Sequence, residues 1–320
     1  MRYSPTGRPS RSVDVTDERD PSQDPPADRP DRQPAADAFA ALSDPLRVDI
    51  IRALAAHTRA NPETPTARFS TLRTAVGDID SGRFRYHLNE LRDTFVRKET
   101  DGYRLTYAGK RIVAALVAGT YTDRTALSAV DLDSDCPVCG STARARYDDG
   151  VLSVDCDEGH PLFVWTLPPN AATGSDLESL VGLATTLAYH SYELVTGGTC
   201  SECFSAVDRE IETVREEAAG QRYRLTANCD GCGARWSVPV GFALLGHPQI
   251  EALYHRLGRP IREDYWWESA FVTGAVEPEP LSTDPLRIEL SVDHETGGFR
   301  ATVDDRGSVV AVDCWEADGD

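Results

Sequence analysis

Eight cysteines carry the chemistry that the sequence shows most directly. Cys136 and Cys139 form a Cys-x-x-Cys turn, and Cys156 and His160 follow a stretch of alternating residues that predicts a hairpin. Thiolate and imidazole are ligands that zinc prefers, and four of them at one end of a hairpin suit a tetrahedral structural site. The Cys-x3-His spacing departs from a second Cys-x-x-Cys, which leaves open whether His160 is a ligand.

A second set of four ligands follows further along the chain. Cys200 and Cys203 are separated by 25 residues from Cys229 and Cys232, so seven cysteines and one histidine make two sets and Cys314 is left over. The alternative is a redox pair, which would need Cys-x-x-Cys at a strand-to-helix junction, and neither pair opens an evident helix. We therefore expect two structural Zn²⁺ ions in two zinc-ribbon-like modules, residues 132–168 and 198–240. Separate and cross-braced pairings of the two sets both remain open.

Neither cysteine set predicts catalysis. A filled four-ligand site leaves no coordination position for water. The sequence has no His-Glu-x-x-His, no His-x-Glu, no Walker loop and no Gly-x-Ser-x-Gly. We predict that the protein is not an enzyme.

The charge of the chain is unevenly distributed. The net charge is -19, yet residues 37–121 carry +3 and residues 122–320 carry -21. Of the 33 basic residues 31 are arginine, and with 52 acids the composition resembles that of halophile proteins, although GC-rich codon usage also favours arginine. Residues 1–36 contain seven of the 20 prolines and few large apolar residues, so we expect a disordered tail there.

The N-terminal residues and the hydropathy indicate where the protein works. No stretch reaches the length of a membrane span, and the first arginines are followed by no apolar segment of a secretory signal. We expect a cytoplasmic protein that does not bind a membrane.

The basic segment, 37–121, begins with two predicted helices. The first runs from about 45 to 57, because Ser43 or Asp44 can cap it and Pro45 suits its first position. A second, shorter helix begins near Ser70, turns Leu72, Ala75 and Val76 inward, and stops at Gly77.

The third segment, 81–93, predicts an amphipathic helix that Ser81 can cap. Its apolar stripe is Phe84, Leu88, Leu91 and Phe95. Its other face carries side chains suited to base edges and phosphates in a major groove, namely Arg83, Arg85, Tyr86, Asn89 and Arg92, with Ser81 at its start. Two β-rich runs around Asp101-Gly102 then predict a hairpin over 96–106 with Lys98 and Arg104 near its tip, and a last helix follows over 107–118.

These elements resemble a known DNA-binding module. The runs LSDPLRVDIIRAL, FSTLRTAVG, SGRFRYHLNELRDTFV and DGYRLTYAGKRIVAAL are similar to the winged helix of ArsR-type transcriptional regulators, most clearly in the "YHL..L" and "YRLT..G" motifs. The resemblance implies duplex DNA binding and a homodimer formed by the first and last helices, with Leu42, Ile51, Ile112 and Leu116 as candidate contacts. The family's metal-sensing cysteine pair is absent, because 37–121 contain no cysteine.

The C-terminal part predicts further helices and strands. A helix over 175–195 has one broad apolar face, formed by Leu177, Leu180, Val181, Ala184, Leu187 and Leu194. A second helix is expected over 248–257, and residues 264–272 and 287–315 are interpreted as strands with turns at 295–298 and 304–307.

Together these patterns predict an α+β protein, an N-terminal winged helix-turn-helix (37–121) followed by an acidic α+β domain (132–320) with two zinc-ribbon-like sites. The layout resembles regulators of halophilic archaea that join an ArsR-like winged helix to a cysteine-containing domain. We expect a sequence-specific regulator of double-stranded DNA, with the C-terminal domain serving stability, dimerisation or the sensing of an unidentified effector. The alternative is a protein-interaction adaptor that docks on transcription or RNA machinery without reading sequence. A sensor acting through Cys314 or a labile zinc is a third hypothesis.

Overall fold

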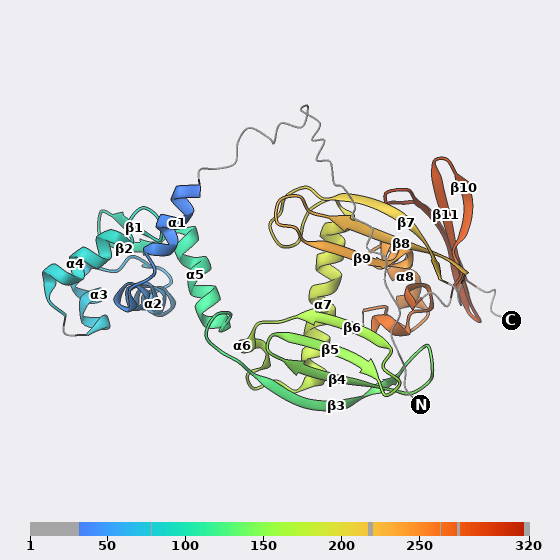
Figure 1. The fold of residues 1–320 in the computed structure, drawn as a ribbon, viewed down its shortest axis with the longest axis horizontal. Coiled ribbons are helices and arrows are strands. Elements are labelled where there is room, and N and C mark those ends of the chain that lie inside the picture. Colours follow the sequence, from blue (N-terminus) through green and yellow to red (C-terminus); the bar gives the residue numbers. More distant parts are fainter. Residues whose placement is uncertain (1–31, 78, 217–219, 263, 274–275, 317–320) are drawn as a thin grey trace, which may run out of the picture. The chain divides into compact units, whose positions relative to one another are not determined.

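The computed structural model describes residues 32–77, 79–216, 220–262, 264–273 and 276–316. Helices and several antiparallel sheets alternate along the chain, so the expected α+β class is confirmed (Figure 1). The chain divides into two compact units, Met1–Val113 and Ala114–Asp320. Within the described ranges, no helix has both the length and the apolar character that a membrane crossing would require.

The first unit contains helices and one hairpin. Its elements are α1 (Arg32–Ala40), α2 (Pro45–Ala60), α3 (Phe69–Val76), α4 (Ser81–Glu90), β1 (Val96–Glu99), β2 (Gly102–Leu105) and α5 (Tyr107–Ala118), of which α5 continues into the second unit. Helix α2 begins where expected, because the Asp44 carboxylate accepts a 2.9 Å hydrogen bond from the backbone N–H of Leu46 and Pro45 needs no such partner.

The apolar stripe of α4 forms the centre of the first unit's core. Phe84, Leu88 and Leu91 are fully buried, and the Phe84 ring meets Phe69 edge-on at a centroid distance of 5.1 Å. Burial of each such side chain contributes about 1.5–3 kcal/mol, so this stripe fixes which face of α4 points to solvent.

The tail, the end of α4 and the burial of Ala75 differ from the sequence predictions. Residues 1–31 of the expected tail lie outside the described residues, whereas 32–36 belong to α1. Helix α4 ends at Glu90 and not at 93, because Asp93 has a φ of +69°, which no right-handed helix accommodates. Ala75 is exposed, since α3 makes only two turns and buries mainly Leu72.

The hairpin β1–β2 is tied to the segment that precedes α3. Ala67 and Tyr103 exchange two backbone hydrogen bonds of 2.9 Å each, in an antiparallel bridge. Gly102, with a φ of +155°, allows this approach, because a Cβ at that position would lie 2.2 Å from the carbonyl oxygen of Ala67.

The second unit begins with a four-stranded antiparallel sheet in the order β3-β4-β5-β6. Its strands are β3 (Ala126–Asp135), β4 (Thr142–Asp148), β5 (Val151–Cys156) and β6 (Pro161–Thr166). The predicted β4–β5 hairpin is confirmed, since Asp148 pairs with Val151 and Asp149 and Gly150 both have positive φ, as a tight two-residue turn requires.

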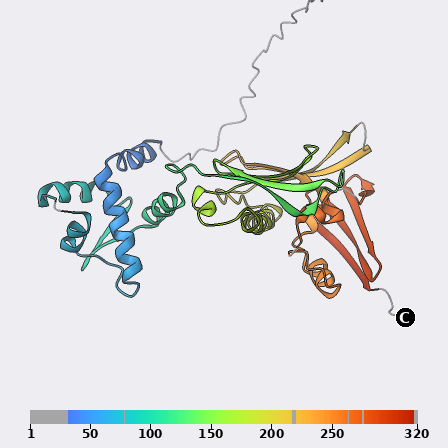
Figure 2. The same cartoon turned by 90° about the horizontal axis from the view of Figure 1, so that it is seen from below.

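Helix α7 (Leu177–Thr196) follows the short α6 (Pro169–Ala172) and packs on the first sheet. Figure 2 views α7 almost end-on, below one face of that sheet. Four residues of the predicted apolar face are buried, Leu177, Leu180, Val181 and Ala184. Leu187 and Leu194 are each 40% exposed instead, because Ala188, Tyr189, Ser191 and Val195 form the buried face at the end of α7.

A second antiparallel sheet and a short helix follow α7. The sheet has the order β7-β8-β9, with β7 (Asp208–Glu216), β8 (Gly220–Asn228) and β9 (Arg235–Pro239). A 3-10 turn η1 (Val240–Leu244) leads to α8 (Pro248–Arg256), which confirms the helix predicted over 248–257.

The next segment corrects one prediction and confirms another. Residues expected to form a strand over 264–272 form η2 (Trp266–Glu268) and α9 (Ala270–Thr273), because Trp266 and Trp267 are anchored by aromatic packing against Phe163 and not by a ladder of backbone bonds. The predicted C-terminal strands are present in a sheet of order β10-β11-β12-β13, with β10 (Glu279–Thr283), β11 (Leu286–His294), β12 (Gly297–Asp304) and β13 (Val309–Glu316).

The second unit holds two hydrophobic clusters. One lies between the β3–β6 sheet and α7, and the other joins the β7–β9 and β10–β13 sheets through α8 and η1. Tyr192 and Trp266 pack against both clusters, so the two cores are continuous at these side chains.

Candidate metal centres and nucleic-acid interface

Each Cys-x-x-Cys pair lies in a turn with the same backbone pattern. The N–H of Cys136 donates to the carbonyl of Ser141 at 2.8 Å, and the N–H of Gly140 donates back to the carbonyl of Cys136 at 2.8 Å. The same two bonds recur in the turns that begin at Cys200 and Cys229. This geometry presents two thiols on one side of each turn, which is what a shared metal ion requires.

The position after the second cysteine adopts a left-handed conformation in all three turns. Gly140 and Gly233 occupy it with φ of +74° and +77°, values that glycine adopts freely. Phe204 occupies it in the third turn with a φ of +62°, and this residue is 68% exposed. A bulky residue in this region costs about 1–2 kcal/mol, so the surrounding turn must hold Phe204 in place.

The turn that begins at Cys156 is one residue shorter. The N–H of Cys156 donates to the carbonyl of His160 at 3.2 Å, and Gly159 makes the return bond with a φ of +79°. The shorter loop brings the imidazole, and not a second thiol, next to the Cys156 sulfur. His160, whose role the sequence left open, therefore lies in the first cluster.

The four groups of the first cluster converge. Sγ of Cys139 and Sγ of Cys156 are 3.6 Å apart, and Nδ1 of His160 lies 3.7 Å from Sγ of Cys136 and 3.4 Å from Sγ of Cys156. All four ligand atoms lie within 4.8 Å of one another.

The second cluster is formed by thiols alone. Sγ of Cys200 lies 3.6 Å from Sγ of Cys232, and Sγ of Cys203 lies 3.5 Å from Sγ of Cys229. Each set is self-contained, and Cys314 lies apart on β13 with its thiol near the carbonyl of Gln249. The ligand sets predicted from spacing are thus brought together as two separate sites.

The spacing of the ligand atoms fits a tetrahedral ion. Zinc–sulfur bonds of about 2.3 Å and zinc–nitrogen bonds of about 2.0–2.1 Å give tetrahedron edges of roughly 3.5–3.8 Å. Adjacent thiols in both clusters lie at this distance, far beyond the roughly 2.05 Å of a disulfide bond. Both sites could therefore hold a metal ion.

Two serines that the sequence reasoning missed tune these thiols. Hydrogen bonds from the hydroxyl and backbone N–H of Ser141 lower the pKa of Cys139 to about 6, and Ser205 lowers the pKa of Cys203 to about 6 in the same way. Burial raises the pKa of Cys136. A repeated Cys-x-x-Cys-x-Ser was the available signal. The lowered pKa values favour the thiolate forms of Cys139 and Cys203, and the thiolate is the form in which cysteine binds a metal.

The predicted DNA-facing residues of α4 lie on its solvent side. Arg83, Arg85, Tyr86 and Asn89 are exposed, opposite the buried Phe84 stripe. Across the described residues, no ion pair is recorded for the guanidinium groups of Arg83 and Arg85, although the Arg85 group lies 5.5 Å from the centre of the Phe69 ring. Both charges remain available to an acidic partner.

The start and end of α4 correct two expectations. The N-cap is Asp80 and not Ser81, because the Asp80 carboxylate accepts bonds from Gly82 and Arg83 at 2.8 and 2.9 Å, and these bonds lower its pKa. Ser81 is the first helical residue and is half-buried. Arg92 lies beyond the end of the helix and is half-buried, and its Nε has no hydrogen-bond partner among the described residues. It therefore does not belong to the exposed face of α4.

The exposed basic residues of the hairpin differ from those expected. Lys98 is exposed on β1, but Arg104 forms an ion pair with Glu99 and is half-buried. Arg97, which the sequence reasoning did not single out, is exposed and lies directly opposite Arg104 across the two strands. The free cations of the hairpin are thus Lys98 and Arg97, as far as the described residues show.

Together the fold and the clusters define an α+β protein with two four-residue sites able to hold a metal ion. Residues 133–309 match the family model described as a domain of unknown function (DUF7351), which covers more than half of the chain, so the protein belongs to this family. Residues 35–116 match a second model, also described as a domain of unknown function (DUF7347). No curated protein and no solved structure matches the chain.

Proposed function

We propose that the protein is a homodimeric, sequence-specific regulator that reads duplex DNA with α4 and the hairpin β1–β2 of a winged helix-turn-helix. The observation that supports this most strongly is the exposed face of α4, where Arg83, Arg85, Tyr86 and Asn89 stand opposite a buried stripe. This face lies in the one long segment with a net positive charge, +3 over residues 37–121. An arginine fork pairs with guanine at two atoms and asparagine pairs with adenine, so the face suits base edges.

The acidity of the C-terminal part limits how DNA can bind. Residues 122–320 carry -21, so phosphates are repelled there and attracted only near the first unit. If the cell holds molar salt, counterion release adds little affinity, and base-edge hydrogen bonds must supply the selectivity. Two structural Zn²⁺ ions in the cysteine clusters complete the proposal, since the ligand spacing suits that ion.

The dimer is supported by exposed apolar residues on the first and last helices of the unit. Phe39 on α1 is 73% exposed and Tyr107 on α5 is 77% exposed, while Ile112 and Leu116 are half-buried. Ile51, a contact expected from the sequence, is fully buried in the core of its own unit and is removed from the proposed interface.

Selection of duplexes from a random-sequence library at molar KCl tests the proposal. The enriched duplex is then titrated against the wild type and against Arg83→Ala/Arg85→Ala, which should lose at least about 30-fold in affinity, since each base contact contributes about 1–3 kcal/mol. Arg52→Ala/Arg59→Ala is the matched control, because it removes the same charge from exposed positions on α2.

Equal losses in the two double variants would show that only net charge matters, and the reading role of α4 would then be wrong. A protein that enriches no duplex would favour the adaptor hypothesis.

A further inference from the structure

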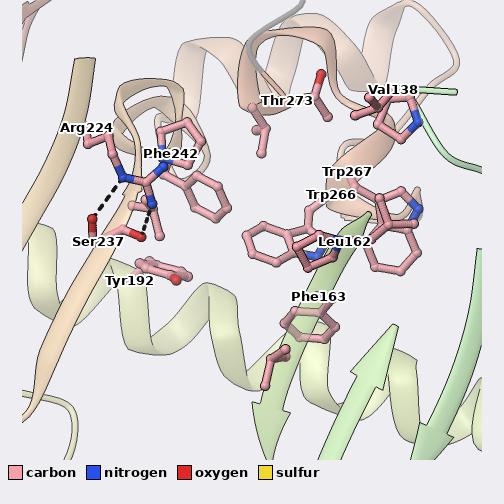
Figure 3. Close-up of a pocket in the computed structure, with 16 residues that line it drawn as sticks. Val138, Leu162, Phe163, Tyr192, Arg224, Ser237, Phe242, Trp266, Trp267 and Thr273 are labelled. Carbon is pink, nitrogen blue, oxygen red and sulfur yellow. Dashed lines mark hydrogen bonds between the residues drawn. The ribbon is translucent and has the colours of Figure 1, made fainter. Parts of the chain in front are cut away.

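A cavity of about 440 Å³ lies inside the second unit, between the two cysteine-containing modules (Figure 3). Its walls come from β6 of the first sheet, β8 and β9 of the second, and the segment around η2 and α9. This volume lies within the roughly 300–1,000 Å³ of small-molecule sites.

Aromatic rings make up much of the wall. The Trp266 indole meets Phe242 edge-on at 4.4 Å and Phe163 edge-on at 5.0 Å, and Tyr192 lies 4.9 Å from Phe242. In Figure 3 these rings gather around the centre of the cavity. Rings that pack against one another offer fixed faces and edges, which suit a flat apolar body.

One cation stands at the edge of this apolar cavity. The Arg224 guanidinium is held in place by Ser237, because its Nε donates to the serine hydroxyl at 2.9 Å and its Nη2 donates to the serine carbonyl at 2.6 Å (Figure 3). No carboxylate pairs with Arg224 within the described residues, and none lines the cavity. Seven of the twelve arginines of this unit whose side chains the structure describes have an acidic partner, and Arg224 belongs to the other five.

Two tryptophans and one tyrosine add polar hydrogens to the wall of the cavity. The indole N–H of Trp266 is buried and has no hydrogen-bond partner in the described part of the chain, whereas that of Trp267 donates to the Ser134 hydroxyl at 3.0 Å. Burial raises the pKa of Tyr192, so its hydroxyl keeps its proton.

We propose that this cavity binds a small organic carboxylate with a flat, apolar body, whose carboxylate pairs with Arg224 and whose body lies against Trp266, Phe163 and Phe242. An anion is favoured because the lining side chains include one guanidinium that has no ionic partner among the described residues and include no carboxylate. Arginine binds carboxylates through two parallel bonds, and a charge-assisted bond of this kind contributes about 10- to 100-fold in affinity. All residues that line this site belong to the second unit, so the proposal does not rest on DNA binding by the first unit.

The position of the cavity connects an occupant with both candidate metal sites. Val138, between the ligands Cys136 and Cys139, lines the cavity, and so does Pro161, which follows His160. From the other module, Ser237 and Pro239 lie on the strand that follows the second cluster. A bound carboxylate would therefore contact both modules at once.

Calorimetric titration of the full-length, metal-loaded protein tests the proposal. The probes are indole-3-acetate, 1-naphthoate and phenylacetate, each compared with its uncharged amide. At least one acid should bind with a dissociation constant below 1 mM and about 10-fold or more tighter than its amide. Arg224→Gln should remove this preference while Trp266→Phe weakens acid and amide alike, and Arg300→Gln, at an exposed position on β12 outside the cavity, is the matched control.

Metal content and thermal unfolding establish that each variant is folded before titration. If Arg224→Gln does not fold, the acid-to-amide comparison on the wild type still decides. Three results would each overturn the proposal. The first is a dissociation constant above 1 mM for all three acids, and the second is equal affinity for acid and amide. The third is a folded Arg224→Gln variant that still binds the acid more tightly than the amide.

Discussion

Replacing Gly102 with alanine would separate the hairpin from the segment before α3. A Cβ on Gly102 would lie 2.2 Å from the carbonyl oxygen and 2.7 Å from the carbonyl carbon of Ala67. Both are backbone atoms, so no side chain can rotate away. The two 2.9 Å hydrogen bonds between Ala67 and Tyr103 lie beside this contact, and the substitution must open them.

The expected magnitude follows from these contacts. A residue other than glycine at a φ of +155° costs about 1–3 kcal/mol, and each lost backbone bond adds about 0.5–1.5 kcal/mol. Gly77→Ala is the matched control, because Gly77 also has a strongly positive φ, +124°, while nothing lies within 4 Å of its Cβ. The two lost hydrogen bonds should therefore separate the variants by about 1–3 kcal/mol.

Hydrogen–deuterium exchange followed by mass spectrometry measures this difference locally. Peptides that contain Ala67 and Tyr103 should exchange roughly 10- to 100-fold faster in Gly102→Ala than in Gly77→Ala, because exchange reports the opening of these bonds. Equal exchange in the two variants would refute the reasoning that the glycine is required by the close backbone approach. Affinity for a selected duplex should fall in parallel, since the hairpin would no longer be positioned.

Three further outcomes are expected. Elemental analysis should find two zinc ions per chain in the wild type and one in Cys203→Ser, which lacks a ligand of the second cluster. A wild-type protein without zinc would contradict the proposal that the two clusters bind this metal. Leu116→Glu should shift the protein from dimer to monomer in sedimentation, whereas an unchanged mass would exclude α5 from the interface. Burial raises the pKa of Tyr189 from its ordinary 10.0 to about 12, so this tyrosine stabilises the fold below pH 10 and that contribution, about 2–3 kcal/mol, is lost as pH rises from 10 to 12. Urea unfolding of Tyr189→Phe should show a flatter decline over this range, and an identical decline in wild type and variant would disprove the assignment.

The features that the sequence predicted well depend on neighbours close in the chain. The stripe of Phe84 and Leu88 has the period of a helix, and Asp149-Gly150 sets a tight turn by local backbone preference alone. The metal ligands belong to the same group, because each turn holds its own pair and one hairpin brings two turns together. The role of His160, which the spacing left open, became clear only from the structure, where a loop that is one residue shorter brings its imidazole next to Cys156.

The features that the sequence missed depend on distant partners. Trp266 and Trp267 lie in a stretch of strand-like composition, yet packing against Phe163, about a hundred residues earlier, places them in a 3-10 turn. The pairing of Arg104 with Glu99 depends on how two strands align. The spacing of apolar residues within one segment carries no information about contacts with a distant segment. The aromatic cavity was not predicted because its wall is formed by such distant segments.

Tyr192 and Trp266 pack against both clusters of the second unit, and from this we expect the unit to unfold in a single step. The sequence suggests two tandem modules, and tandem modules would melt one after the other. Because Tyr192 and Trp266 contact the hydrophobic cores of both modules, unfolding of one module would expose side chains that pack against the other. Neither module should therefore unfold by itself. Heating should therefore give one cooperative transition for residues 126–316, and a chain cut between the modules should leave two fragments that do not fold.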